Sequence, residues 1–313
     1  TLLTHLTGGS AGREGASIQF GGSIGNWLGK LAHLDEFDHH VMIMCGMSAA
    51  FAAVFGTPMA AAVFAMEVVS VGVMYYAALL PCVIASIIAA EFATGMGIDP
   101  ETFPVHSIPG LTVETGLKMA LIAVGCGILS ILFCILLKTV GQLYTKYLKN
   151  PYIRIVVAAG VIILLTICLN TKDYMGAGSG LIARAIEKGE ARPLDFLWKM
   201  LLTALTMRAG YRGGEIVPAF SIGATFGCVA GGILGFSPEL AAAASMVALF
   251  CGVTNCPITA MLISFELFGF SGAAYYLIAI SISYAVSGYY SLYKDQTIVY
   301  SKYKARYINR KTR

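Results

Sequence analysis

Long apolar stretches that contain no charged side chain, separated by short polar breaks, make up most of this chain. They cover residues 41–66, 68–90, 119–137, 155–171, 216–238, 240–265 and 267–293. Each approaches or exceeds the roughly 20 apolar residues that a helix needs to cross the hydrocarbon core of a bilayer. Several are interrupted by Gly and Pro, and we expect these to form tilted or broken helices that meet inside the membrane. The pattern predicts an all-α polytopic membrane protein.

One pattern of Gly, Pro and Glu occurs twice in this chain, about 199 residues apart. In each copy a Gly/Glu-rich break is followed, 43 residues after one of its glycines, by a proline, and 9 residues later by a glutamate. These residues are Gly15, Pro58 and Glu67 in the first copy, and Gly214, Pro257 and Glu266 in the second. A repeated apolar unit with such breaks is typical of transporters whose ion site lies between two pseudo-symmetric halves.

The repeat predicts how the chain is divided. We expect a first repeat over residues 1–110, a second repeat of membrane helices over residues 111–301, and a basic cytoplasmic tail over residues 302–313. About 90 residues of helix-like sequence, 111–202, precede the second copy of the pattern and have no equivalent before the first. We therefore expect a full-length form to carry a comparable segment upstream.

The composition excludes an ordinary soluble domain. Charged residues make up 12% of the chain, whereas roughly a quarter of the residues in soluble domains are charged. Lys and Arg are concentrated in residues 138–154 and 302–313. Such an excess beside membrane spans predicts that both segments face the cytoplasm, in a multi-pass protein of the cell membrane. Nucleic-acid-binding proteins also carry basic tails, but here we interpret the tail as a solvated juxtamembrane segment and expect no nucleic-acid partner.

Side chains that could hold a metal or perform covalent catalysis are scattered. The 8 Cys residues lie in apolar stretches without C-x-x-C spacing. The neighbouring His39 and His40 point to different sides of a helix. We therefore expect no metal site and no cofactor. An intramembrane enzyme is an alternative class, but it would need a paired nucleophile and base or a metal cluster at helical spacing.

Glu14 is the first candidate for a functional side chain. It follows Arg13, is flanked by Gly, and precedes an apolar helix predicted over residues 16–28. The free N–H groups of a helix start favour negative charge, and an acid inside the membrane is a functional candidate by default. Burial and the positive helix start act on this carboxyl in opposite senses, which makes it a candidate for proton exchange. The alternative is that Glu14 only caps its helix.

The second copy of the break supplies a matching helix start. Residues 212–218 (Arg-Gly-Gly-Glu-Ile-Val-Pro) precede an apolar helix predicted over residues 219–234. Gly allows close approach of the backbone, and Pro218 suits a first helical turn. Two helix starts that face each other within the membrane make a positive pocket without a fixed cation, which favours anions. The alternative is a helix-packing contact between small residues.

Several segments of the chain, taken in order, resemble the CLC family of chloride channels and proton-coupled anion exchangers. Residues 12–19 (Gly-Arg-Glu-Gly-Ala-Ser-Ile-Gln) resemble the GREGPxxQ signature, and residues 213–218 resemble the GGxFxP motif. Residues 296–301 (Gln-Thr-Ile-Val-Tyr-Ser) resemble the segment that bears the pore tyrosine, and the helices at Pro58 and Pro257 match the helix pair of that family. The resemblance covers essentially the whole chain and implies a CLC-type inverted repeat of broken, tilted helices, assembled as a homodimer with one pore per subunit.

The resemblance also implies roles for individual residues. Glu14 would be the gating glutamate, whose carboxylate occupies an anion site and leaves it when protonated. Tyr300 would direct its hydroxyl at the central anion, whereas the residues alone also fit an aromatic of the membrane interface. The anion path would be lined by residues around the two helix starts, namely Arg13, Gly15, Gly213, Gly214, Glu215, Ile216 and Val217.

Two departures from the family pattern bear on function. The GSGxP segment would precede Thr1 and is absent, while residues 176–180 (Gly-Ala-Gly-Ser-Gly) fit the corresponding segment of the second repeat. The inner proton-relaying glutamate of the exchangers would follow Glu67, where this chain has Val68. Glu67 and Glu266 look like structural acids that bond to neighbouring helix ends.

The resemblance therefore implies transport of an anion, chloride or fluoride, with the halide, the proton and the lipid bilayer as partners. The missing inner acid argues against the usual chloride/proton exchanger and suits either a passive channel or the fluoride-exporting CLC branch. We favour fluoride/proton antiport, because residues 214–218 resemble the GGEVTP segment of that branch. Val217 stands where that branch often has Thr. Two alternatives stay open, a passive chloride channel of the voltage-gated type and a non-transporting, truncated membrane fragment.

Overall fold

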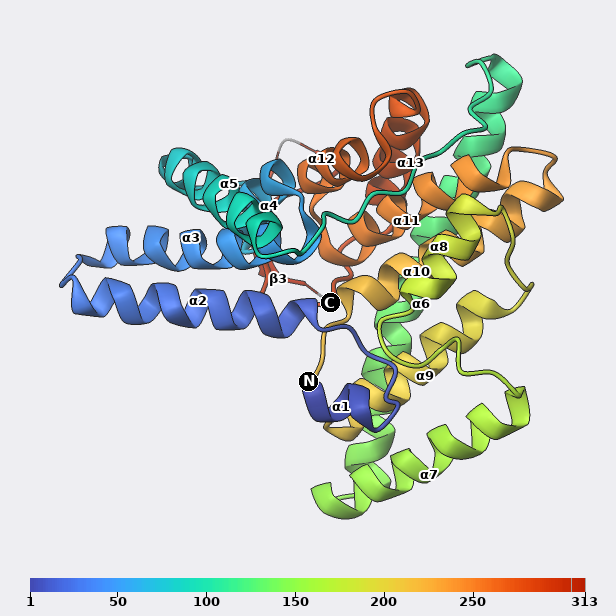
Figure 1. Ribbon diagram of the computed structural model, residues 1–313, viewed down its shortest axis with the longest axis horizontal. Coiled ribbons are helices and arrows are strands. Elements are labelled where there is room, and N and C mark those ends of the chain that lie inside the picture. Colours follow the sequence, from blue (N-terminus) through green and yellow to red (C-terminus); the bar gives the residue numbers. More distant parts are fainter. Residues whose placement is uncertain (305, 313) are drawn as a thin grey trace.

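The computed structural model describes residues 1–304 and 306–312, and most of these residues are helical (Figure 1). The first-half helices are α1 (Leu2–Leu6), α2 (Glu14–Leu31), α3 (Glu36–Phe55), α4 (Pro58–Glu67), the 3-10 helix η1 (Tyr76–Ala78) and α5 (Leu79–Gly95). The remaining helices are α6 (Val113–Tyr147), α7 (Pro151–Leu169), α8 (Ser179–Glu187), α9 (Asp195–Ala209), α10 (Ile216–Ile233), α11 (Pro238–Thr254), α12 (Pro257–Phe268) and α13 (Ala273–Val286). Five helical segments are long and apolar enough to cross a membrane, so the prediction of an all-α membrane protein is confirmed.

The helices α2 to α5 recur as α10 to α13, in the same order. Several uncharged stretches were expected to break, and two of them, residues 41–66 and 240–265, do so just before a proline. In the first, α3 ends at a left-handed Gly56 and α4 begins at Pro58. In the second, α11 ends at a left-handed Asn255 and α12 begins at Pro257. Each proline occupies the first turn of its helix, where its missing N–H costs no hydrogen bond.

Apolar helices of similar hydropathy occupy different places in the fold. Every residue of α11 from Leu240 to Thr254 is buried, and α11 forms the centre of the largest hydrophobic core cluster. By contrast, only 11% of the apolar window of α7 is buried within the protein, against 72% for α10. A helix that is apolar on all sides suits either a protein interior or lipid. The interior position of α10 and α11 brings the start of α10 to the middle of the molecule.

The helices α2 and α3 form a hairpin that projects to one side of the molecule, with α4 and α5 packed on α3 (Figure 1). Gly21 and Gly46 face each other where these helices cross, and a Cβ added at Gly46 would lie 2.1 Å from the carbonyl oxygen of Gly21. Small residues at such a crossing let two backbones approach closely within a membrane. This contact fixes the direction of α2, and therefore the position of its first residue, Glu14.

A small three-stranded sheet contains the C-terminal segment of the chain. Strand β1 (Ser70–Val71) pairs in parallel with β2 (Thr297–Tyr300), which pairs in antiparallel fashion with β3 (Tyr307–Lys311). Residues 307–311, within the predicted basic tail of residues 302–313, are largely exposed and form an edge strand.

Candidate functional site

The two Gly-rich breaks of the repeat meet through their backbones. Gly12 donates a hydrogen bond to the carbonyl of Gly214 at 2.8 Å, and Gly214 donates one to the carbonyl of Gly12 at 2.7 Å. This antiparallel bridge joins residues that are about 200 positions apart in the chain. Because α2 and α10 begin directly after these breaks, the positive ends of both helices are brought to one place.

Glu14, the first residue of α2, is buried beside this bridge, with only 3% of its surface exposed. Its carboxylate folds back over Gly12, since a Cβ added there would lie 2.0 Å from Oε2. A Cβ on Gly214 would lie 3.3 Å from the same oxygen. Oε2 is buried and has no hydrogen-bond partner within the described part of the chain. An unpartnered buried carboxylate oxygen is costly, and such groups are commonly functional.

The close approach at the bridge leads to a first prediction. A methyl group on Gly214 would lie 2.8 Å from the backbone nitrogen of Gly15, which cannot rotate away. We expect Gly214→Ala to lower the free energy of unfolding by about 1–3 kcal/mol, because the two helix starts must separate. Denaturant unfolding of the purified protein in mild detergent measures this change.

Gly110→Ala is the matched control for that variant. No atom lies within 4 Å of a Cβ added at Gly110, and its φ is not positive, so we expect little change in stability. Equal stabilities of the two variants would contradict the proposed tightness of the Gly12–Gly214 bridge.

A cavity of about 400 Å³ opens beside the bridge. Of the residues predicted to line an anion path, the following line this cavity: Gly15, Gly213, Gly214, Glu215 and Ile216. The other lining residues are Ile18, Gln19, Met47, Phe64, Val68, Val69, Tyr293, Asp295 and Gln296. The cavity thus combines backbone from two helix starts with a mainly apolar wall, an arrangement suited to holding an anion through N–H dipoles.

Four predicted residues lie outside this lining. Glu14 lies behind Gly214, the side chain of Arg13 is exposed, and Val217 is buried. Tyr300, the fourth of these residues, does not line this cavity. It lies on β2 with 47% of its surface exposed, and its ring packs on Tyr307 with centroids 5.8 Å apart.

Tyr293 is the tyrosine that lines the cavity. The sequence pattern of residues 296–301 pointed to Tyr300 instead, and nothing in the sequence pointed to Tyr293, because the path of the chain decides which tyrosine faces the cavity. Gln296 supports this wall. Its side-chain amide donates to the carbonyls of Val68 and Thr254 at 2.9 and 2.7 Å, which ties the ends of α4 and α11 together.

Asp295 places a negative charge at the edge of the same cavity. Lys311 of β3 donates a hydrogen bond to its carboxylate at 2.7 Å, and this contact holds the pKa of Asp295 below its usual range. The carboxylate is therefore ionised at neutral pH.

The prediction that Glu67 and Glu266 are structural acids is confirmed. Glu67, at the end of α4, accepts hydrogen bonds from the backbone of Ile258 and Thr259 at 3.1 and 2.9 Å, and from the Thr259 hydroxyl at 2.6 Å. Glu266, in α12, accepts from the backbone of Met59 and Ala60 at 2.8 and 2.9 Å. Each acid therefore caps the start of the other repeat's helix. The next position, Val68, presents an apolar side chain to the cavity.

Lys199 was missed in the sequence analysis. It is completely buried in α9, and its ammonium donates to Ser10 Oγ at 3.0 Å and to the carbonyls of Tyr174 and Gly176 at 3.1 and 2.7 Å. These bonds tie the segment before α2 to the segment before α8. A single lysine among apolar neighbours was the available signal, because ionisable side chains within the membrane are seldom without a role.

Clusters of at least three His, Cys, Asp or Glu side chains that could bind a metal do not occur within residues 1–304 and 306–312.

Comparison with known proteins identifies relatives of this chain. The family model described as voltage gated chloride channel matches residues 1–288. A chloride/fluoride channel protein of Pseudomonas syringae pv. tomato is 33% identical over 312 residues, which cover 97% of this chain and 68% of that protein. The H(+)/Cl(-) exchange transporter ClcA of Vibrio cholerae is 28% identical over 82% of this chain, and the match spans 58% of that protein.

Solved structures of related proteins superpose on this chain. A CLC-type fluoride/proton antiporter superposes with a TM-score of 0.90 at 35% identity, covering 94% of this chain and 74% of that one. A slow cyanobacterial Cl-/H+ antiporter superposes with a TM-score of 0.74 at 19% identity, over 91% of this chain and 70% of that one, which shows a shared fold.

Proposed function

The chain belongs to the voltage gated chloride channel (CLC) family of anion transport proteins, and from this membership we propose that it exchanges fluoride for protons across the cell membrane. Glu14 is the group that gates the anion path and takes up the proton. The observation that carries this proposal is the buried, unpartnered Oε2 of Glu14 beside the Gly12–Gly214 bridge.

The proposed cycle follows from the charge of the Glu14 side chain. As a carboxylate, Glu14 competes with a bound anion for the N–H groups at the starts of α2 and α10. A proton from solution that binds a carboxylate oxygen removes this negative charge and frees the donors for the anion. When the proton leaves to the other side, the carboxylate returns and displaces the anion. The Glu14 carboxyl group therefore couples the movement of the anion in one direction to the movement of the proton in the other.

The remaining lining residues complete the proposed anion site. Backbone at Gly15 and at residues 213–216 supplies the dipoles, and Tyr293 takes the role first assigned to Tyr300, as a hydroxyl donor to the anion. A small anion requires such close donors, because its removal from water costs on the order of 20 kcal/mol in the Born limit. Arg13 and Val217 contribute through the two helix starts on which they lie.

Two observations favour fluoride/proton exchange over chloride transport. Val68 places an apolar side chain where the chloride/proton exchangers are expected to carry an inner acid. The matched proteins also include one named as a chloride/fluoride channel protein and one described as a fluoride/proton antiporter. A homodimer with one path per subunit completes the proposal.

The experiment that tests this function is a liposome efflux assay with the full-length protein. Internal fluoride or chloride is released, and a halide electrode and an external pH electrode record both fluxes together. We expect fluoride efflux to exceed chloride efflux by about tenfold or more, a difference of about 1.4 kcal/mol in activation free energy. Fluoride efflux should also be accompanied by proton uptake.

Each contrary result has a definite meaning. Chloride efflux equal to or faster than fluoride efflux contradicts the fluoride preference. Rapid fluoride efflux without proton movement would identify a passive channel, and absence of any halide flux would identify a protein that does not transport.

A further inference from the structure

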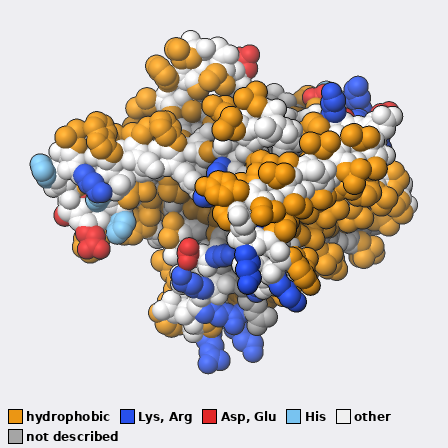
Figure 2. Space-filling view, turned by 90° about the horizontal axis from the view of Figure 1, so that it is seen from below, with side chains coloured by type: hydrophobic (Ala, Val, Ile, Leu, Met, Phe, Trp, Pro, Cys, Tyr) orange, Lys and Arg blue, Asp and Glu red, His pale blue; other side chains and the backbone are white. Residues whose placement is uncertain are grey.

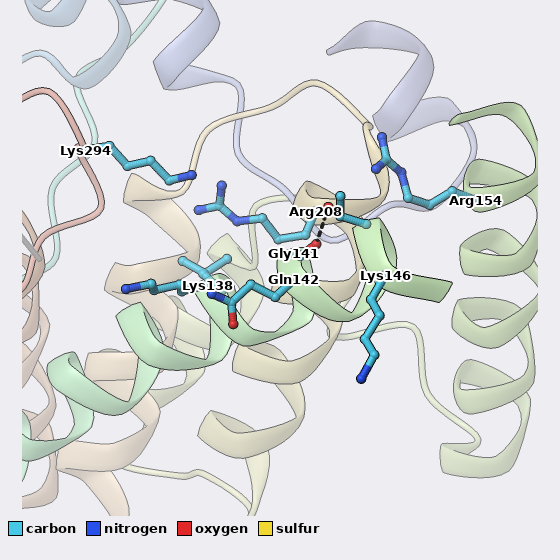
Figure 3. A pocket seen from close by; sticks show the side chains of 9 residues that line it. Lys138, Gly141, Gln142, Lys146, Arg154, Arg208 and Lys294 are labelled. Carbon is cyan, nitrogen blue, oxygen red and sulfur yellow. Dashed lines mark hydrogen bonds between the residues drawn. The ribbon is translucent and has the colours of Figure 1, made fainter. Parts of the chain in front are cut away.

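A second cavity, of about 590 Å³, lies at the end of the molecule where α6 finishes, α7 begins and α9 finishes. Its lining includes five cationic side chains, Lys138, Lys146, Arg154, Arg208 and Lys294 (Figure 3). No acidic residue lines it. We call it the basic pocket. In Figure 3 the head groups of Arg208 and Lys294 point toward each other, and that of Lys138 lies below them.

The positive charges of the basic pocket are poorly compensated by the protein. Arg208 contacts Glu215 at 3.5 Å, but its Nε is buried without a hydrogen-bond partner in the described part of the chain. Lys138 and Lys294 have no carboxylate within 4.0 Å among the residues that the structure describes. Like charges that converge with one acid nearby repel one another, so the pocket favours a multivalent anion.

The geometry of the arginines fits a phosphate group. Arg154 is held in place because its Nε donates to the carbonyl of Ala209 at 2.9 Å, which leaves its terminal nitrogens directed elsewhere. A guanidinium presents paired donors that match two phosphate oxygens, whereas lysine acts as a mobile point charge. The pocket contains both types of side chain, and its volume lies within the range of small-molecule sites.

The surroundings of the pocket favour a phosphate that belongs to a lipid. It lies between the ends of two helices that are long and apolar enough to span a membrane, α6 and α7. Leu143, Ile153 and Val156 on these helices expose 48%, 54% and 70% of their surfaces, which suits contact with acyl chains. Tyr147 and Tyr152 are exposed beside them, as expected at the level of lipid headgroups. Figure 2 shows Lys and Arg side chains gathered mainly in one region of a face otherwise rich in hydrophobic side chains.

We propose that the basic pocket binds the phosphate headgroup of an anionic phospholipid. The phosphate lies between Arg208, Lys138 and Lys294, and the acyl chains lie against α6 and α7. Basic pockets between membrane helices on the side rich in Lys and Arg bind such headgroups in other membrane proteins. The site differs from the central cavity in its size, in its fixed cations and in its position at the membrane surface.

The test uses native mass spectrometry of the purified full-length protein, titrated with phosphatidylglycerol or with phosphatidylcholine. We expect phosphatidylglycerol to bind preferentially. The double variant Lys138→Gln/Lys294→Gln should weaken this binding by roughly tenfold or more, because each cation near an anionic lipid contributes about 1 kcal/mol. The double variant Lys30→Gln/Lys188→Gln makes the same change of charge at exposed positions outside the pocket and should bind as the wild type does.

Equal loss of phosphatidylglycerol in both double variants would overturn the proposal, because the attraction would then depend on net charge alone. Equal binding of phosphatidylcholine and phosphatidylglycerol would overturn it as well. Inorganic pyrophosphate is added as a separate arm. If pyrophosphate binds in the pocket and phosphatidylglycerol does not, the ligand is a soluble polyphosphate and the lipid assignment is wrong.

Discussion

Replacement of Glu14 by Gln is expected to abolish proton transport while anion flux continues. Gln has the size and shape of a protonated glutamate but cannot gain or lose a proton near neutral pH. The anion path should therefore stay permanently in the state that Glu14 adopts when protonated. We expect proton uptake in the liposome assay to fall by about a hundredfold or more, in line with the loss of one acid–base group. Anion efflux should lose its dependence on pH.

Glu114→Gln is the control for this variant. Glu114 lies at the start of α6 with 76% of its side chain exposed, and it pairs with Lys118 at 2.7 Å. Exposed ion pairs of this kind contribute little, so we expect normal transport. If Glu14→Gln retained proton coupling and pH dependence at the level of Glu114→Gln, Glu14 would be only a helix cap, the alternative that its sequence left open.

The second large effect is expected for Glu67→Ala, and it concerns stability. Removal of this carboxylate leaves three donors at the start of α12 without an acceptor. The backbone N–H and the hydroxyl of Thr259 are buried, and the backbone N–H of Ile258 is partly buried. A buried donor without a partner costs about 1–3 kcal/mol. We expect the free energy of unfolding to fall by about 3 kcal/mol or more, measured by denaturant titration in mild detergent.

Glu266→Ala provides the comparison within the same molecule. It removes the symmetry-related cap, but Glu266 is only partly buried and its hydrogen bond from Met59 is exposed, whereas Glu67 and its bonds from Thr259 are buried. Water can replace the lost acceptor there, so we expect a smaller loss of about 1 kcal/mol. Similar effects of the two variants would contradict the difference in burial on which this prediction depends.

Glu67→Gln distinguishes a structural acid from a proton relay. Gln keeps one acceptor oxygen for the start of α12, so stability should fall less than in Glu67→Ala, and proton uptake per fluoride should remain unchanged. A loss of proton coupling without a loss of stability would identify Glu67 as the inner proton acceptor and would overturn its structural assignment.

The sequence contained enough information to predict the broken helices, because local chemistry controls them. Pro58 and Pro257 lack an N–H group and favour the first turn of a helix, while Gly56 and Asn255 adopt the left-handed conformation that ends one. The spacing of the repeat likewise placed Glu67 and Glu266 at equivalent positions. These equivalent positions led to the prediction that both acids bond to neighbouring helix ends, and the structure shows that each caps the helix that begins at the proline of the other repeat.

Other features could not be predicted from the sequence, because they depend on which distant segments of the chain pack against one another. Apolar side chains are stable both in contact with lipid and in a protein core. Hydropathy therefore did not distinguish the buried helix α11 from the peripheral helix α7. Tyr293 and Tyr300 lie in one short stretch, and only the pairing of β2 with β1 and β3 turned the second of them outward. The roles of Lys199 and of the basic pocket likewise required knowing which elements become neighbours.

The sequence by itself therefore determined that this is an all-helical membrane protein of repeated design, with an acid at the start of one helix and a Gly-rich break before its counterpart. These properties depend on residues close together in the chain and on the length of apolar spans. Only the tertiary structure decided that Gly12 and Gly214 form one backbone bridge, that the Glu14 carboxylate is buried there, and which side chains surround it. Such contacts join residues about 200 positions apart, so they depend on how α2 and α10 pack in the folded core and not on local sequence.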